Sequence, residues 1–346
     1  MSHFDVPNCA LVLFGKENIQ TIEIDDPALS AGQVRVQISY SAICGTQLGE
    51  WAQMRGTDPY LPHCLGHEAV GVVIEKAAFV TTVDVGDTVI ISWMKNNGVS
   101  SAAPAYKSTQ GLKINSGECA TFVRRAILPE NRLTKVNIEK VEPAHALIGC
   151  AQLTAIGLLK ATQEHGYTIG DRAIVFGLGG IGFACASLLT KTGVKVTGVD
   201  QESVISNLKN RLDLPLVQLS TSSELIGLQQ EWDFAVIAAG SISAMESALD
   251  LLPKNSGALF IIGNPPHGEK LKIETKSLLY GRKIVGVGEK DVSTQKDIWR
   301  LVELFYSDKN ENNTQVGRRV KLDEDFNELF RELHKGSGKR TVIDFT

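Results

Sequence analysis

The chain has 346 residues, of which 43% are hydrophobic and 21% charged, and its formal net charge is −4. This length and apolar content suffice for two packed domains, whereas the slight acidic excess gives no electrostatic basis for binding nucleic acid or an anionic membrane. No uninterrupted apolar run approaches the ~18 residues of a membrane span, and no basic segment precedes an apolar one at the N-terminus, so we expect neither a span nor a signal peptide. Six widely spaced cysteines are too few for a disulfide scaffold, which favours a cytoplasmic protein.

The first part of the chain, up to Pro143, predicts mainly β-structure. Apolar and polar residues alternate over 33–40, and short β-branched runs bounded by Gly or Asp occupy 69–75 and 85–92. The segment 93–117 is polar and rich in small residues, which predicts a long surface loop.

Beyond Pro143, predicted strands and helices alternate. Near-continuous apolar strands are predicted at 172–177, 194–200, 233–240 and 257–263, with helices in the later part of 145–164 and at 180–193 and 243–252. This alternation predicts a parallel sheet covered by helices on both faces. The C-terminal segment predicts helices at 297–307 and 324–336, a polar loop at 308–315 and a final strand at 340–345.

The loop GLGGIG at 177–182 fits the G-x-G-x-x-G fingerprint of dinucleotide-binding domains. It follows a predicted strand and opens a predicted helix, and the next strand ends at Asp200, 23 positions after Gly177. Gly177 would allow the tight turn, Gly179 the approach of the pyrophosphate, and Gly182 close packing of helix and strand. Asp200 would bind the adenosine ribose and repel the 2′-phosphate of NADP, so the sequence favours NAD over NADP. A glycine turn without a cofactor stays open as an alternative.

Candidate metal ligands cluster in the stretch LPHCLGHEAVG at 61–71. Four of them lie within six positions: His63, Cys64, His67 and Glu68. A structural zinc finger needs a second pair at similar spacing, and none lies nearby, which argues against a self-contained site. Other candidates are Cys44, just after a predicted strand, and Cys150, where the sequence pattern changes.

Four stretches resemble the zinc-containing alcohol dehydrogenases of the medium-chain dehydrogenase/reductase family. They are CGTQ at 44–47, GHEAVGVVIEKAAFV at 66–80, GCAQLTAIG at 149–157 and GLGGIG at 177–182. The resemblance covers essentially the whole chain. It implies an α/β protein with a GroES-like, β-rich catalytic domain at 1–149 and 290–346 and a Rossmann domain, a doubly wound parallel sheet, at 150–289.

The resemblance also implies a catalytic metal site. His67 matches a zinc ligand, with Cys44 and Cys150 as its partners, and Glu68 matches a residue close to the metal; His63 and Cys64 match nothing functional. Two thiolates and a neutral imidazole suit Zn²⁺ and leave it close to neutral, so that it can still polarise an alcohol oxygen.

Further residues take their expected roles from the same resemblance. Thr46 matches the hydroxyl that accepts the alcohol proton, Thr154 a residue beside the nicotinamide, and Arg340 a residue that reaches the cofactor pyrophosphate. Gly180 and Ile181 lie within the cofactor loop. A threonine at a strand end and a solvated surface arginine remain alternatives for Thr46 and Arg340.

The chain departs from the family pattern at several positions. The segment 93–117 contains no cysteine, so we expect one zinc per chain and no second, structural zinc. Gln47 replaces an aspartate that supports the zinc-bound histidine, Gly45 replaces an arginine, and Gly49 stands where some members have a relay histidine. Trp93 matches a position that lines the substrate pocket.

The expected function is zinc-dependent oxidation of an alcohol to an aldehyde or ketone with NAD as acceptor. The substrate is a simple alcohol, a polyol or a sugar-like intermediate, and the resemblance suggests a homodimer or homotetramer that binds neither nucleic acid nor membrane. Two alternatives stay open: a zinc-free reductase of enones or quinones on the same fold, and a non-catalytic dinucleotide-binding protein.

Overall fold

The computed structural model describes residues 4–54, 56–209, 217–225, 231–265, 268–306, 316–336 and 340–346, and the polar loop expected at 308–315 lies outside them. The chain divides into two compact units. Unit 1 comprises Met1–Leu153, Ser293–Lys335 and Arg340–Thr346, and unit 2 comprises Thr154–Val292 and Gly336–Lys339.

Unit 1 is built mainly from antiparallel strands. Its strands are β1 (Asn8–Gly15), β2 (Asn18–Ile24), β3 (Gln33–Ala42), β4 (His63–Cys64), β5 (Glu68–Lys76), β6 (Thr88–Ser92), β7 (Tyr106–Lys107), β8 (Lys113–Ile114), β9 (Arg125–Pro129), β10 (Leu133–Lys135), β17 (Val316–Val320) and β18 (Arg340–Asp344). Its helices are α1 (Gly45–Trp51), α7 (Thr294–Tyr306) and α8 (Phe326–His334), with short helical turns η1 (Glu130–Arg132), η2 (Pro143–Leu147) and η3 (Ile148–Gln152).

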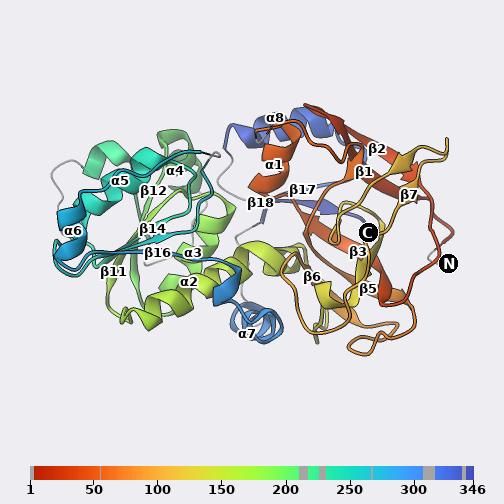
Figure 1. The fold of residues 1–346 in the computed structure, drawn as a ribbon, viewed down its shortest axis with the longest axis horizontal. Helices are drawn as coiled ribbons and strands as arrows, with labels where there is room; N and C mark the ends of the chain where they lie inside the picture. Colours follow the sequence, from red (N-terminus) through yellow and green to blue (C-terminus); the bar gives the residue numbers. More distant parts are fainter. Residues whose placement is uncertain are drawn as a thin grey trace. The chain divides into compact units, whose positions relative to one another are not determined.

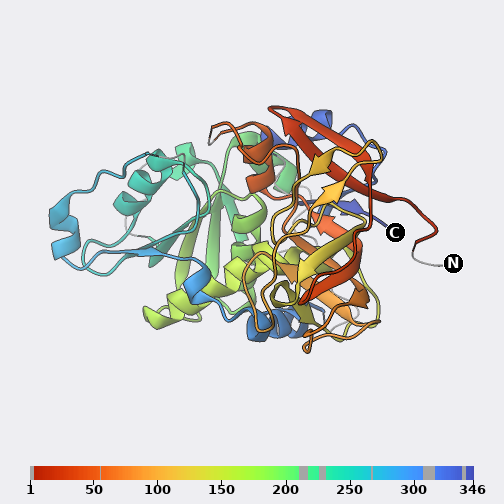
Figure 2. The same cartoon turned by 45° about the vertical axis from the view of Figure 1, so that its right-hand side comes forward.

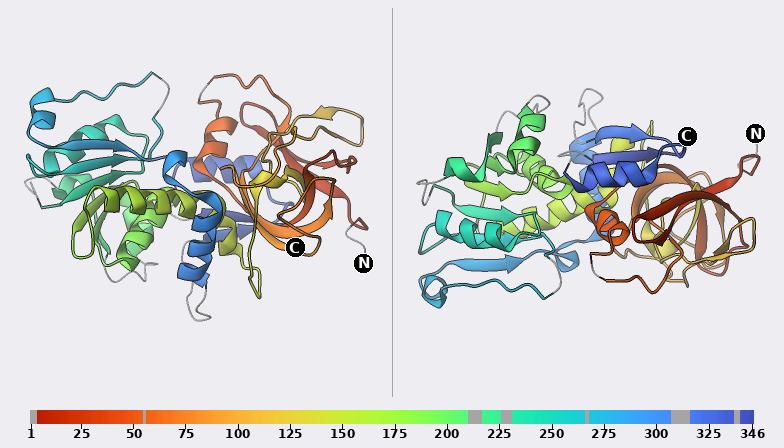
Figure 3. Two further views of the ribbon diagram at one scale, coloured as in Figure 1. Left: turned by 60° about the horizontal axis from the view of Figure 1, so that its bottom comes forward. Right: turned by 90° about the horizontal axis from the view of Figure 1, so that it is seen from above.

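The largest sheet of unit 1 centres on β3. Its order is β10-β6-β5-β3-β18-β17, with β9 also paired to β3, while β2-β1-β4 form a second sheet and β7-β8 a short hairpin. Figure 3 shows these strands wrapped around a shared interior, which is filled by one hydrophobic core that includes Leu11, Val36 and Phe122. The predicted strands at 33–40, 69–75 and 85–92 correspond to β3, β5 and β6.

The prediction of a surface loop at 93–117 is wrong in part. The hairpin β7-β8 lies within it, and Tyr106 and Ile114 are 1% and 0% exposed. The hydroxyl of Tyr106 accepts a hydrogen bond from the Ile127 backbone N–H at 2.8 Å. The buried side chains of this hairpin therefore anchor part of the segment to the core.

Unit 2 contains a six-stranded parallel sheet. Its strands are β11 (Arg172–Phe176), β12 (Lys195–Val199), β13 (Val217–Ser220), β14 (Phe234–Ile237), β15 (Ala258–Ile261) and β16 (Lys283–Gly286). Its helices are α2 (Leu153–Glu164), α3 (Gly180–Lys191), α4 (Glu202–Lys209), α5 (Ile242–Leu251) and α6 (Thr275–Leu279), with turns η4 (Ser222–Leu225) and η5 (Glu289–Asp291). Figures 1 and 2 show the strands with helices beside them.

The strand order of unit 2 is β13-β12-β11-β14-β15-β16. From β11 the chain runs outward to β13 at one edge, and it then crosses back to β14, on the other side of β11. The connection through α3 runs one way along the sheet and the connection through α5 runs the other way. Because parallel crossovers are right-handed, these two helices cover opposite faces, as the sequence pattern predicts. This is the Rossmann strand order, and ligands of such sheets bind at the carboxyl ends of the strands where the order reverses.

One run among the described residues, Pro143–Glu164, is long and apolar enough to cross a membrane by length and composition. However, 89% of its most apolar window is buried inside the structure. Burial in the fold therefore accounts for its apolar character.

Candidate metal centre

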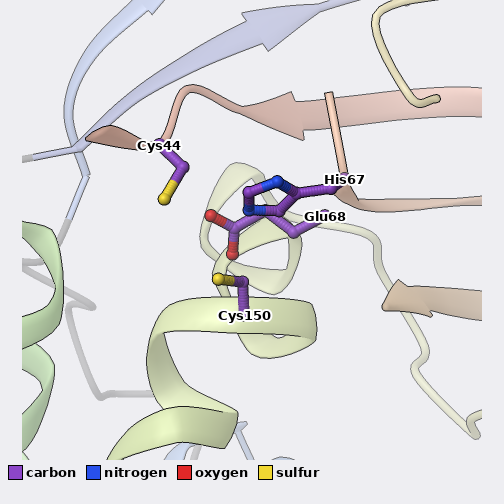
Figure 4. A group of neighbouring side chains, drawn as sticks. All are labelled: Cys44, His67, Glu68 and Cys150. Carbon is purple, nitrogen blue, oxygen red and sulfur yellow. The ribbon is translucent and has the colours of Figure 1, made fainter. Parts of the chain in front are cut away.

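Four side chains that can bind a metal converge within unit 1. Ligand atoms of Cys44, His67, Glu68 and Cys150 all lie within 4.8 Å of one another (Figure 4). Cys44 is the residue before α1, His67 and Glu68 stand at the start of β5, and Cys150 belongs to the π-helical turn η3. Such wide turns are frequent at functional sites. Three separate segments thus supply the cluster.

Two glycines allow these segments to approach. Gly66, just before His67, has φ +94°, and a Cβ there would lie 2.5 Å from the side chains of Thr121 and Phe122. A Cβ on Gly149, just before Cys150, would lie 2.0 Å from the Ile91 carbonyl oxygen. Any larger residue would push β5 or η3 out of place.

The cluster fits the donor set of a zinc ion. Burial leaves the His67 Nε2 atom without a hydrogen-bond partner. The Cys150 thiol beside it holds the pKa of Cys44 well below its usual value, while the same contact raises the pKa of Cys150. An imidazole nitrogen without a hydrogen-bond partner beside a thiol that ionises readily supplies the N and S donors that Zn²⁺ prefers, and thiolates bind it far better than thiols do.

Glu68 and Arg340 form a buried ion pair beside this cluster. Arg340 Nη2 lies 2.8 Å from Glu68 Oε1, with side-chain exposures of 7% and 0%, and Nη1 donates to the Ile43 carbonyl at 2.6 Å. Burial raises the pKa of Glu68 to about 7 even though Arg340 lowers it. Arg340 is therefore not a solvated surface residue, and its expected contact with a cofactor pyrophosphate stays a prediction.

Gln47 links two of the candidate ligands. Its Nε2 lies 2.8 Å from His67 Nδ1, and its Oε1 accepts a hydrogen bond from the Cys44 backbone N–H at 2.9 Å. The side chain is 1% exposed. Next to it, Thr46 is an exposed residue whose hydroxyl lies 3.9 Å from Cys44 Sγ, so it borders the cluster.

His63 and Cys64 lie outside the cluster. His63 Nε2 pairs with Asp58 Oδ2 at 2.6 Å, and burial raises the pKa of Cys64 to about 12, which keeps it a neutral core thiol. Cys119, which the sequence did not single out, donates its thiol to the His67 carbonyl at 3.4 Å. Trp93 is 37% exposed.

The glycine-rich loop of unit 2 has the geometry that its expected role requires. Gly177 has φ +86°, which the tight turn needs, and a Cβ on Gly179 would meet no atom within 4 Å, so the backbone there is open to a ligand. A Cβ on Gly182 would lie 1.7 Å from the Gly177 carbonyl oxygen. Gly180 and Ile181 form the first turn of α3.

Asp200 follows β12 and faces this loop. Its Oδ2 accepts a hydrogen bond from the Leu178 N–H at 2.6 Å, and its Oδ1 accepts one from the Gln201 N–H at 2.7 Å. The carboxylate therefore stabilises the glycine loop itself. Thr154 is half-buried in the first turn of α2, four residues after Cys150.

Comparisons with known proteins agree with this architecture. The sequence profile of the alcohol dehydrogenase GroES-like domain matches residues 30–138. An S-(hydroxymethyl)glutathione dehydrogenase of Paracoccus denitrificans is 26% identical over 96% of this chain and 98% of its own length.

Solved structures share the fold. An alcohol dehydrogenase zinc-binding domain protein from Burkholderia ambifaria superposes with a TM-score of 0.85 at 22% identity, over 98% of this chain and 99% of its own. Benzyl alcohol dehydrogenase from Acinetobacter calcoaceticus gives 0.80 at 22% identity, over 99% and 100%. The metal cluster and the glycine loop lie in the chain order that the sequence motifs predict, and the chain is similar over nearly its full length to zinc-containing alcohol dehydrogenases of the medium-chain dehydrogenase/reductase family.

Proposed function

We propose that this protein is a zinc-dependent oxidoreductase that transfers a hydride between an alcohol and NAD, giving an aldehyde or a ketone. The observation that carries the proposal is the convergence of Cys44, His67 and Cys150, with a buried, unpartnered Nε2 atom on His67. The glycine loop of the parallel-sheet unit supports the cofactor. A zinc-free enone or quinone reductase would not need this set of three ligands.

Cys44, His67 and Cys150 would hold the zinc, which when bound supplies a Lewis acid that polarises the alcohol oxygen. The hydroxyl of the exposed Thr46 borders the cluster and can accept the alcohol proton. Glu68 keeps a carboxylate close to these three residues, where Arg340 balances its charge. We assign the catalytic domain to 1–149 and 290–346 and the Rossmann domain to 150–289.

The chain takes a nicotinamide cofactor, and we propose NAD over NADP. The carboxylate of Asp200 at the end of β12 would repel a 2′-phosphate, and the next three residues, Gln201, Glu202 and Ser203, carry no positive charge to bind one. Thr154 would lie beside the nicotinamide.

We further propose that the protein is a cytoplasmic homo-oligomer acting on small molecules, a homodimer or homotetramer. The strand β16 is an edge strand of the parallel sheet, and nearby Leu279 and Tyr280 are 79% and 56% exposed. An unpaired edge beside exposed apolar side chains favours self-association. The net charge of −4 supports no nucleic-acid or membrane partner.

Metal analysis and turnover test the proposal together. Protein purified without added metal or chelator should contain close to one zinc per chain and should reduce NAD in the presence of an alcohol. The panel should include benzyl alcohol, simple alcohols, polyols and S-(hydroxymethyl)glutathione, the last because of the relatives' names. Protein that binds NAD but contains no zinc would favour the zinc-free reductase or the non-catalytic binding protein.

A further inference from the structure

The side chain of Gln47 lies between a backbone N–H group and an imidazole nitrogen. On one side is the backbone N–H of Cys44, which can only donate, 2.9 Å from Gln47 Oε1. On the other side is His67 Nδ1, 2.8 Å from Gln47 Nε2. The residue is 1% exposed, so the described structure leaves little room for water to take over either contact.

The Cys44 N–H fixes which end of the amide faces which partner. A backbone donor needs an acceptor, so the amide oxygen points to Cys44 and the amide nitrogen points to His67. An amide nitrogen only donates, so His67 Nδ1 must accept. A neutral imidazole that accepts at Nδ1 carries its single proton on Nε2.

The Nε2 atom is the one that points into the cysteine cluster, where it has no hydrogen-bond partner. A metal ligand must present a bare nitrogen. We propose that Gln47 is a positioning residue that holds His67 of the metal-free protein in the tautomer unsuited to metal binding. This inference deepens the proposed function and rests on the assignment of His67 as a zinc ligand.

Metal binding would then require a coupled rearrangement. The proton leaves Nε2, another proton binds Nδ1, and the ring stays neutral. The Gln47 amide turns so that its oxygen accepts from Nδ1–H, which brings its NH₂ group against the Cys44 N–H and leaves two donors facing each other. The hydrogen bond lost in this way is the one by which Gln47 reaches back to the N-cap backbone of α1. Gln47 therefore lowers the affinity of the site for zinc.

A carboxylate removes the conflict, because each oxygen accepts hydrogen bonds. Gln47→Glu keeps the length of the side chain, and one oxygen can accept from the Cys44 N–H while the other accepts from His67 Nδ1–H. The substitution should raise zinc affinity by about 10–100-fold, the usual size of effects from partners of a ligating histidine. Gln47→Met, which has a similar length and forms neither hydrogen bond, is the matched control and should not raise the affinity.

The direct test is the tautomer of His67 by nitrogen-15 NMR of histidine-labelled, metal-free protein above pH 8. The chain has seven histidines, and the His67 signals are those lost in His67→Gln. We expect the ring proton on Nε2 in the natural protein and on Nδ1 in Gln47→Glu. A proton on Nδ1 in the natural protein, alone or together with Nε2, would overturn the proposal.

Competition with a chromophoric chelator gives the second readout, the zinc dissociation constant of each variant. An affinity of folded Gln47→Glu that equals or falls below that of the natural protein would also overturn the proposal, with NAD binding as the check on folding. Neither readout uses turnover. A protein that binds zinc but oxidises no alcohol would therefore contradict the proposed function and leave this inference intact.

Discussion

The buried ion pair of Glu68 and Arg340 allows a quantitative prediction. Arg340→Met removes the charge and keeps an apolar side chain of comparable length. It leaves Glu68, which is 0% exposed, without its 2.8 Å partner, and it also removes the donor to the Ile43 carbonyl. An uncompensated buried charge typically costs about 3–5 kcal/mol of unfolding free energy, so Glu68 of the variant should stay protonated and the variant should lose what the natural protein gains by ionising it.

The loss depends on pH, with a sign set by Glu68. Its pKa in the folded protein is about 7, above the usual 4.5, so the contribution of this carboxyl to stability is fully present below pH 4.5 and falls as pH rises through about 7. Removing Arg340 raises this pKa further. Below pH 5 Glu68 is neutral with or without Arg340, so only lost hydrogen bonds remain, worth about 1–2 kcal/mol. The variant should therefore approach the natural protein at low pH and diverge above pH 7.

Thermal unfolding of metal-free, cofactor-free protein at pH 5 and pH 8 measures both values. At pH 8 the natural protein gains about 1.4 kcal/mol by ionising a carboxyl whose pKa is about 7, and the variant loses this gain together with the hydrogen bonds, about 2–3 kcal/mol in all. For a unit of this size 1 kcal/mol corresponds to about 2–4 °C, so Arg340→Met should lower the Tm by about 4–12 °C at pH 8 and by about 2–8 °C at pH 5. Arg318→Met is the control, because Arg318 pairs with Glu324 and Glu332 at the surface, where such pairs contribute less than about 1 kcal/mol. Equal shifts for both variants at pH 8, or a shift of Arg340→Met that does not shrink at pH 5, would refute the reasoning.

Three further experiments test the site assignments. Cys150→Ser should abolish zinc binding and turnover while the protein stays folded, whereas Cys64→Ser should retain one zinc per chain. The zinc content of each variant is measured by metal analysis. Full zinc retention in Cys150→Ser would remove Cys150 from the ligand set. Asp200→Ala should narrow the preference for NAD over NADP. It should also weaken binding of both cofactors, because the carboxylate accepts a 2.6 Å hydrogen bond from the glycine loop. An unchanged ratio of kcat/KM for NAD and NADP would show that Asp200 does not set the cofactor preference. Gly182→Ala places a Cβ 1.7 Å from a backbone oxygen and should lower the stability of unit 2 by more than about 1 kcal/mol. Gly179→Ala should leave the Tm unchanged and weaken only NAD binding. Calorimetry measures both Tm values, and equal values for the two variants would contradict this difference.

The sequence predicted most helices and strands correctly, because hydrophobic periodicity and helix-stop residues act over a few neighbouring positions. The alternation over 33–40 appears as β3, and the helix predicted to stop at Gly193 ends at Lys191, followed two residues later by Gly193 at φ +84°. The error at 93–117 has a physical cause. Tyr106 and Ile114 lie in strands of only two residues each, too short for a periodic pattern, and the core that they fill lies on distant strands.

At the candidate metal centre, too, contacts between residues distant in sequence could not be predicted. The resemblance singled out Cys44, His67 and Cys150 as candidate ligands because their sequence motifs are short and contiguous. The partner of Glu68 lies far away in sequence: Arg340 is 272 positions from it, and the antiparallel pairing of β18 with β3 brings it near. Composition predicts that a buried carboxylate has a partner but does not say which of many arginines it is.

The orientation of the Gln47 amide is another feature that only the structure shows. The sequence shows that an amide replaces a carboxylate, which predicts a weaker partner for His67. Only the structure shows that the same amide also accepts from the Cys44 N–H, which fixes its orientation and presents its donor to the ring. The consequence for metal binding follows from the direction of two hydrogen bonds rather than from the loss of a charge. A neutral side chain one hydrogen bond away from a ligand can thus decide which nitrogen that ligand offers to the metal.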